Sequence, residues 1–496
     1  MTLCRQLGAI GLLIVVRPVH AETLYDAITM ACETNPALQA QRADLRAAGE
    51  DLEQARDAFG PSVTLSGQLA YDAARVDQPA SIFSGPSVGR YRAKTASADV
   101  ALVEPLYSSG ALTAHQTGAT STLSAAQQGL RRVEGKLILE VIAAYEDVRR
   151  DRDVVTILET EIASLEGILR ENDARKALGQ LTKTDVAESA ARLIGARAQL
   201  LLSRGRLNSS EAAYLGLVGQ APGHLDDEPE FEHLPRSIDD AYDVAEKNNP
   251  ELMAASALER ASRAKIQEAR AAYGPTVALK LDGSIAPNDL YLDQQYARSA
   301  SVAITFSVPL YTSGINRSKE RAAIAGNSKA DANVDVTKRS VFQTVAQAWD
   351  QINANRDAIE LYDQQLKANR ESLKGNRIEE RVGQRRTIDI LNAQLELSNT
   401  QIAMVQAFHD EYVAEATLIN AMGLLEARML VPDIRRPTGG AHYRHWPVIL
   451  TNPIEAVAMT ADKVGATLPK PHNARPAARM KAAGLSPAPQ TAPETE

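Results

Sequence analysis

The chain has 496 residues, which leaves room for roughly two to four ordinary domains and excludes a single small module. Apolar residues make up 44% of it and charged residues 23%, while aromatic residues are only 4%. This shortage of bulky rings favours long, Ala-rich helices over an ordinary globular core. The formal net charge of -8 argues against a nucleic-acid partner, because phosphate binding needs clustered Lys and Arg.

Residues 1–21 have the pattern of a secretory signal peptide. Arg5 is followed by the apolar stretch Leu7–Val16, and small residues precede Glu22. Arg17, directly after the apolar stretch, leaves an uncleaved anchor open as the alternative. No other stretch has the roughly 18 to 20 apolar residues that a spanning helix needs, so a membrane crossing would have to use strands.

The remainder of the chain is an internal duplication. Two motifs recur 214 residues apart and two more recur 204 residues apart. These are Asn35-Pro36 and Asn249-Pro250, Gly60-Pro61 and Gly274-Pro275, Pro105–Gly110 and Pro309–Gly314, and Gly179-Gln180 and Gly383-Gln384. We expect a first repeat at 22–220, a linker at 221–235, a second repeat at 236–432 and a Pro-rich, largely disordered periplasmic tail at 433–496. Ten extra residues in the first repeat are expected to lengthen the loop Asp77–Arg90.

Each repeat contains two segments in which apolar and polar residues alternate with a period of two. They predict strands at about 61–72, 95–106, 275–286 and 297–309, of a length that suits tilted strands crossing a bilayer. A half-buried sheet in a soluble domain is the alternative. Four strands cannot close a spanning barrel, so the chain would have to pool strands with copies of itself. The expected lipid-facing residues are Val63, Leu65, Leu69, Val277, Leu279, Val302, Ile304 and Phe306.

The rest of each repeat is predicted to be helical. Helices are expected at about 108–178, 184–219, 312–382 and 387–424, and the first and third would each be on the order of 100 Å long. Apolar residues within them follow the three-four spacing of coiled coils. Two antiparallel helix hairpins are therefore expected.

Duplicated halves, Asn-Pro and Gly-Pro pairs, paired amphipathic strands and two long helix hairpins together resemble the TolC-type outer-membrane efflux and secretion channels. The resemblance covers about Glu22 to Pro432. It implies a mostly α chain with transmembrane β strands. Three copies would form a 12-strand β-barrel in the outer membrane of a Gram-negative cell, continued by an α-helical barrel into the periplasm. It also implies a passive duct with no catalysis, no cofactor and no metal, working with a periplasmic adaptor and an inner-membrane ABC or proton-driven transporter.

The same resemblance implies a periplasmic entrance at the turns of the two helix hairpins. Asp389 matches the first of two acidic positions that narrow the entrance, and Asn392 stands at the second as a departure. If a three-fold axis repeats Asp389 as a ring, the ring attracts cations, and the neutral Asn392 weakens that selectivity. Ordinary helix capping is the alternative role for Asp185 and Asp389. The full set of expected entrance residues is Asp389, Asn392, Arg385, Thr184, Asp185 and Glu380, the last of these in place of an aromatic partner.

Three other functions are weighed against protein secretion of type I. One is an outlet dedicated to multidrug efflux, which differs in the partner pump that this chain does not encode. A second is a periplasmic coiled-coil scaffold with no pore. The third is a hydrolase that uses Ser87 in Gly85–Gly89, but this G-x-S-x-G match falls in a predicted strand-connecting loop and not in a strand-to-helix elbow.

Overall fold

The computed structural model describes residues 23–78, 87–231, 234–287 and 295–426, together with Thr460 and Asp462. The chain divides into two compact units. A helical unit contains the described residues of Met1–Ala58, His115–Ala269 and Ser313–Leu450. A strand unit contains those of Phe59–Ala114, Arg270–Thr312 and Thr451–Glu496. The expected signal peptide and nearly all of the expected tail lie outside the described residues, as do Gly85 and Pro86.

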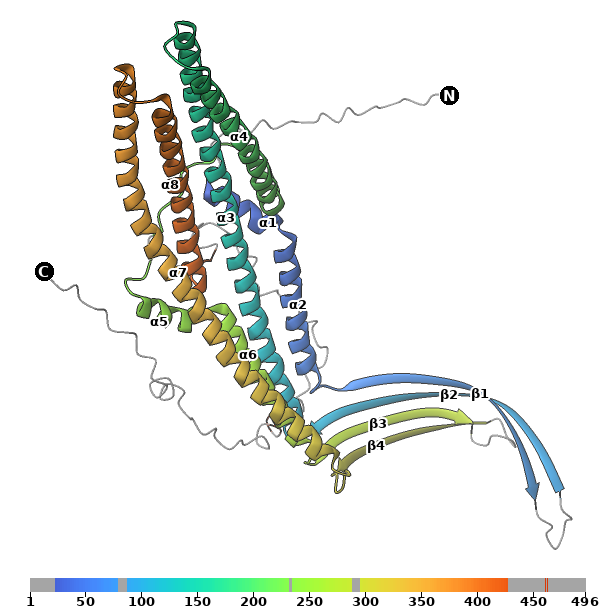
Figure 1. Ribbon diagram of the computed structural model, residues 1–496. Coiled ribbons are helices and arrows are strands. Elements are labelled where there is room, and N and C mark those ends of the chain that lie inside the picture. Colours follow the sequence, from blue (N-terminus) through green and yellow to red (C-terminus); the bar gives the residue numbers. More distant parts are fainter. Residues whose placement is uncertain are drawn as a thin grey trace, which may run out of the picture. The chain divides into compact units, whose positions relative to one another are not determined.

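Eight helices are found in the described part of the chain. The pairs α3 with α4 and α7 with α8 form the two long hairpins (Figure 1), and α3 and α7 each have 67 residues. No described helix is apolar over a long enough stretch to cross a membrane. The helices are α1 (Leu24–Thr34), α2 (Pro36–Asp57), α3 (Ala111–Ala177), α4 (Lys183–Val218), α5 (Ile238–Asn248), α6 (Pro250–Ala271), α7 (Ile315–Arg381) and α8 (Thr387–Ala421).

The duplicated Asn-Pro pairs each join two helices. Asn35 ends α1 and its Oδ1 accepts a hydrogen bond of 2.9 Å from the backbone N–H of Ala37 in α2. Asn249 does the same between α5 and α6, accepting from Glu251 at 2.9 Å. The proline that follows each asparagine takes the first helical position, where no N–H is needed. The motif therefore recurs because the same helix-to-helix corner recurs.

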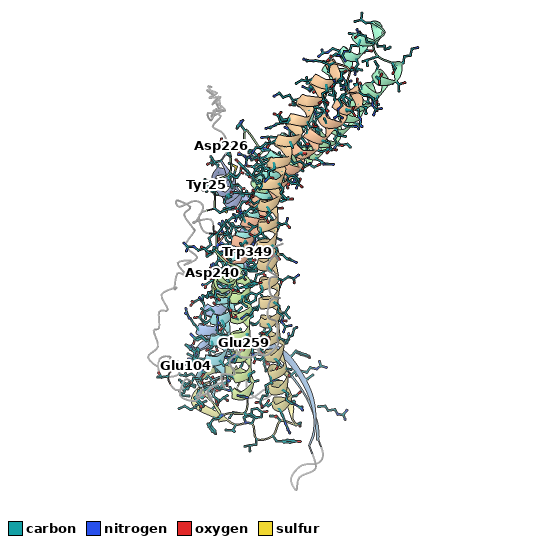
Figure 2. All side chains as sticks on the ribbon, turned by 60° about the vertical axis from the view of Figure 1, so that its left-hand side comes forward. Tyr25, Glu104, Asp226, Asp240, Glu259 and Trp349 are labelled. Carbon is teal, nitrogen blue, oxygen red and sulfur yellow. The ribbon has the colours of Figure 1, made fainter. Side chains whose placement is uncertain are left out.

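The core of the helical unit gathers apolar residues from both repeats. Tyr145 of α3 and Tyr412 of α8 are buried in it, and their hydroxyls donate to the carbonyls of Asp226 and Pro229 in the segment between the repeats, at 2.8 and 3.0 Å. Further along the unit, Glu259 of α6 (Figure 2) accepts a hydrogen bond of 3.0 Å from Asn327 of α7. The two tyrosines thus tie both repeats to the segment between them, and the Glu259–Asn327 contact holds α6 against α7 within the second repeat.

The strand unit contains an antiparallel four-stranded sheet in the order β1-β2-β3-β4 (Figure 1). The strands are β1 (Ser62–Gln78), β2 (Ser87–Tyr107), β3 (Thr276–Pro287) and β4 (Tyr296–Ser307). The register pairs Leu65 with Val100 and Leu281 with Val302.

The first β-hairpin, formed by β1 and β2, is longer than the sequence predicts. β1 and β2 have 17 and 21 residues, whereas β3 and β4 have 12 each. The ten extra residues of the first repeat therefore lengthen the strands and not only a loop, which corrects the expected ends at residues 72 and 95. An antiparallel hairpin accepts such growth because each added pair of residues keeps its backbone hydrogen bonds. Ser87 opens β2 opposite Gln78, so it lies on a strand and not on the nucleophile elbow of a hydrolase.

The Pro-Leu-Tyr-x-Ser-Gly motif forms the corner between a strand and a long helix. Ser109 and Gly110 have φ of 55° and 87°, and Ser313 and Gly314 have 50° and 82°. A left-handed serine costs on the order of 1 to 2 kcal/mol, so a second contact has to hold it. Ser109 Oγ donates to the carbonyl of Pro275 at 2.6 Å, which links this corner to the second Gly-Pro pair.

Asp462, in the expected tail, caps the first of these corners. Its Oδ1 accepts hydrogen bonds from the backbone N–H groups of Ser108 and Gly110, at 3.0 and 2.8 Å, and its Oδ2 accepts from Thr113. The carboxylate is 1% exposed. Burial opposes its ionisation, but the hydrogen bonds from Gly110 and Ser108 outweigh it, so the pKa of Asp462 lies below its ordinary value.

We expect Asp462→Ala to destabilise the strand unit by about 2 kcal/mol or more, because charged hydrogen bonds at a helix N-terminus are lost. A group with a lowered pKa contributes its stability above the unfolded pKa, and the contribution disappears as pH falls through the folded pKa. The difference between variant and wild type in thermal unfolding should therefore be large at pH 7 and shrink in acid. Lys463→Ala, at the adjacent position, is the control. An equal loss in both variants would contradict the capping role.

Candidate functional site

One face of the sheet is apolar and exposed. The register places Val63, Leu102, Leu281 and Val302 in one row across the four strands. Leu65 and Val302 are 76% and 72% exposed, so these side chains are not buried in a core of the strand unit. All eight residues expected to face lipid lie on this apolar face: Val63, Leu65, Leu69, Val277, Leu279, Val302, Ile304 and Phe306.

The opposite face of the sheet is polar. Ser66, Asp99, Ser284 and Ser299 form one row across it. The Ser66 hydroxyl bonds to the Asp99 carboxylate, and the hydroxyls of Ser284 and Ser299 lie 2.8 Å apart. Hydroxyls and carboxylates of this kind favour hydration, so the two faces of the sheet differ sharply in polarity. The strands β1 and β4 are its two outer strands and present open edges.

The turn of the first helix hairpin is closed by a capping box. The backbone N–H of Thr182 donates to Asp185 Oδ2 at 3.0 Å, and the Asp185 N–H donates back to Thr182 Oγ1 at 3.2 Å. The hydrogen bond from the Thr182 side chain is the main cause that lowers the pKa of Asp185, and the positive charge of Arg386 in the second hairpin adds to it. Thr184 lies exposed on the first turn of α4. Asp185 is therefore a cap that also faces a cation of the other hairpin.

The turn of the second helix hairpin places Asp389 in the equivalent position. The Arg386 N–H donates to Asp389 Oδ2 at 3.1 Å. One turn further along α8, Asn392 Oδ1 accepts a hydrogen bond of 3.0 Å from Arg192 of α4. Asn392, which stands where the resemblance implies an acidic residue, thus connects the two helix hairpins of one protomer.

Glu380 also connects the hairpins, as an ion pair with Arg175 near the end of α3. The Glu380 side chain is 9% exposed and that of Arg175 is 23% exposed, so the pair is largely removed from water. Arg385, in contrast, pairs within its own hairpin, with Glu379 at 2.9 Å. Glu380 is therefore a charged residue at a position where the resemblance implies an aromatic side chain. Among the described residues, the partner of Arg385 is Glu379 of its own hairpin and not a residue of the first hairpin.

Sequence analysis missed the partners from the first hairpin, Arg175 and Arg192. The duplication contained a signal for the former, because Arg175 and Lys176 occupy the positions that Glu379 and Glu380 occupy 204 residues later. Opposite charges at equivalent positions of two packed repeats favour pairing. Ser164 of α3 and Gln394 of α8 also bond to each other, at 3.1 Å. Next to them lies a cleft of about 290 Å³ between the hairpins.

Comparison with known proteins identifies the family. The profile described as "Outer membrane efflux protein" matches residues 27–220 and 241–424, which is most of the chain. The chain belongs to the outer membrane efflux protein family. The efflux protein BepC of Brucella suis is 30% identical over 86% of this chain and 90% of its own length. TolC of Vibrio cholerae is 26% identical, over 82% and 92% of the two chains.

Two further relatives differ in what their names describe. The alkaline protease secretion protein AprF of Pseudomonas aeruginosa is 24% identical over 66% of this chain and 69% of its own. The crystal structure of the outer membrane protein VceC of Vibrio cholerae has the same fold, with a TM-score of 0.69 at 20% identity over 81% of this chain and 96% of that one. The member of the outer membrane efflux protein family described here is thus an outer-membrane channel protein of a Gram-negative cell.

Proposed function

We propose that the chain is the outer-membrane duct of a tripartite export machine and works as a homotrimer. Three four-stranded sheets would close into a 12-strand barrel in the outer membrane lipid, and the helix hairpins would continue it as a tube into the periplasm. The main observation that supports this proposal is that the sheet has one exposed apolar face, one polar face and two open edges. In hydrocarbon every edge N–H and C=O must find a partner, and closure with further copies supplies it.

Exposed apolar side chains on the long helices support the same assembly. Leu201 and Leu202 of α4 are 68% and 62% exposed, and Val336 and Leu361 of α7 are both 64% exposed. The apolar cluster that joins α3, α4 and α8 within one protomer contains Leu165, Leu193 and Leu391 and none of these exposed residues, which remain available to a second copy. Coiled-coil helices with an open apolar stripe bury it against another helix. A periplasmic scaffold without a pore would use the same helices but would leave the exposed apolar face of the sheet unexplained.

The duct would receive its cargo from an inner-membrane ABC or proton-driven transporter through a periplasmic adaptor. We propose as cargo either a protein, because the name of the relative AprF describes protease secretion, or a small molecule, because the name of the relative BepC describes efflux. A hydrolase at Ser87 has no support in the strand position of that residue. The proposal is tested by cross-linking in the outer-membrane fraction. A trimer there supports the duct, and a monomer that stays in solution without detergent contradicts it.

The entrance proposal predicts opposite changes from two substitutions. Asp389→Asn removes three charges from the proposed ring and keeps the cap acceptor, so we expect cation over anion selectivity to fall roughly twofold or more. Asn392→Asp adds three carboxylates, and we expect selectivity to rise. The measurement is the reversal potential of the reconstituted trimer in planar bilayers under a salt gradient. Unchanged reversal potentials in both variants would remove these positions from the entrance.

A further inference from the structure

Basic and aromatic side chains follow directly after the apolar part of the lipid-facing sheet face. Lys94 pairs with Tyr71 in the register. Arg92 lies on the same face of β2, two residues closer to the turn between β1 and β2. On β4, Arg298 and Tyr296 follow Ala300 on this face. We call Arg92, Lys94, Arg298, Tyr71 and Tyr296 the basic belt. Its three cations are exposed, and its two tyrosines are 61% and 53% exposed.

The height of the belt on the sheet matches the edge of a bilayer. Counted from Phe306, Arg298 is eight residues along β4. With strands tilted about 40° and a rise of about 3.3 Å per residue, Arg298 would lie on the order of 20 Å above Phe306. Lys94 and Arg92 are four and six residues beyond the row of Arg298. They therefore lie on the order of 10 to 15 Å beyond Arg298 and on the order of 30 to 35 Å above Phe306. An apolar band of about 25 Å therefore ends between Arg298 and Lys94.

The positive charge is confined to the lipid-facing face. At these levels of the sheet, the opposite face of the described strands has Asp72, Thr95, Ser97 and Ser299, and no basic residue. Arg92, Lys94 and Arg298 have no ion-pair partner among the residues that the structure describes. Three exposed cations on one face, spread over the level where the apolar band ends, attract an anion from outside the chain.

The geometry points to a binding surface for the phosphate groups of a phosphorylated glycolipid in the outer leaflet. The belt lies toward the hairpin end of the sheet, whereas the other ends of the strands lead into the helices, which the proposed function places in the periplasm. Guanidinium groups bind phosphate oxygens in pairs, and tyrosine rings prefer the headgroup level of a bilayer. The lipid's acyl chains would then cover the apolar face directly below. This inference rests on the proposed outer-membrane duct.

Two matched lysine variants test the surface. Lys94 and Lys280 both lie on strands of the same sheet, but Lys280 is on the polar face. The purified full-length protein in detergent is titrated with diphosphorylated lipid A, with dephosphorylated lipid A and with inorganic phosphate. We expect Lys94→Gln to weaken binding of diphosphorylated lipid A about threefold, and the triple change Arg92→Gln, Lys94→Gln, Arg298→Gln at least tenfold. Lys280→Gln should leave it unchanged, and dephosphorylated lipid A should bind all forms equally weakly.

Each other outcome overturns the inference. Equal binding of both forms of lipid A by the wild type would show that acyl chains alone are recognised. Competition by inorganic phosphate at the same phosphate concentration would show a free-anion site instead of a lipid site. An unchanged affinity in the triple variant would remove the belt from binding. Cross-linked trimers in the outer-membrane fraction of the triple variant show that the duct persists, so failure of this inference is distinct from failure of the proposed function.

Discussion

Val302→Arg is expected to abolish accumulation of the protein in the outer membrane, whereas Ser301→Arg at the adjacent position leaves it in place. Val302 is 72% exposed and lies mid-strand opposite Leu281 on the apolar face. An arginine that faces lipid near the bilayer midplane costs about 2 to 4 kcal/mol, and a trimer would bear it three times. Ser301 pairs with Asp282 on the polar face, where an added cation is hydrated and finds an opposite charge.

Density-gradient fractionation of whole cells measures the effect directly. The wild type and Ser301→Arg should sediment with the outer membrane as cross-linkable trimers, and Val302→Arg should be found in the periplasm or be degraded. The two variants introduce the same residue one position apart, so a general effect of arginine on synthesis or secretion would affect both. Normal outer-membrane trimers of Val302→Arg would mean that the apolar face does not contact lipid, and the duct would have to be abandoned.

The faces of the sheet could be predicted from the sequence because a single alternation of polarity decides them. One residue of slip would move every apolar side chain to the wet face, so the pattern is strongly constrained wherever one face meets lipid. The length of the first β-hairpin, formed by β1 and β2, could not be predicted in the same way. Beyond Tyr71 both faces carry polar residues, such as Asp72 and Arg75 on β1, so the period-two signal disappears although the strands continue. Polarity alternates only where the two environments differ.

Contacts that join distant segments were harder to predict. Asp462 caps a corner more than 340 residues earlier in the chain, and nothing in the Pro-rich composition around it marks one carboxylate as a cap. The caps at the turns of the helix hairpins could be predicted from local sequence, because Thr182 and Asp185 have the spacing of a capping box. The same local chemistry explains Asp389 without a pore. Its role at an entrance is implied by the resemblance, and the selectivity of Asp389→Asn tests it.

The ion pair of Arg175 with Glu380 leads to the second large prediction, that Arg175→Ala raises channel conductance. The substitution leaves the carboxylate of Glu380, which is 9% exposed, without its partner, and breaking such a pair costs about 3 kcal/mol. Separating the hairpins returns that carboxylate to water and recovers the cost. A bias of about 3 kcal/mol changes the ratio of open to closed entrances roughly a hundredfold.

The other polar contacts between the hairpins near this pair are hydrogen bonds of Arg192 with Asn392, of Ser164 with Gln394 and of Arg377 with Ser164. The cleft next to Glu380 leaves part of the interface unfilled, and the nearest apolar cluster joins Leu165 and Leu193 to Leu391. Arg192 with Asn392 is a single exposed hydrogen bond, which contributes about 1 kcal/mol. The buried ion pair is therefore the contact whose loss should move the second hairpin most.

Single-channel recording in planar bilayers tests this prediction with two controls. Lys176→Ala removes an exposed positive charge from the adjacent position and should leave conductance unchanged. Adding Glu380→Gln to Arg175→Ala removes the buried charge that drives separation, so the double variant should return toward the wild-type conductance. A double variant that conducts as much as Arg175→Ala alone would show that the arginine acts through something other than Glu380, because only the stranded carboxylate links the two substitutions.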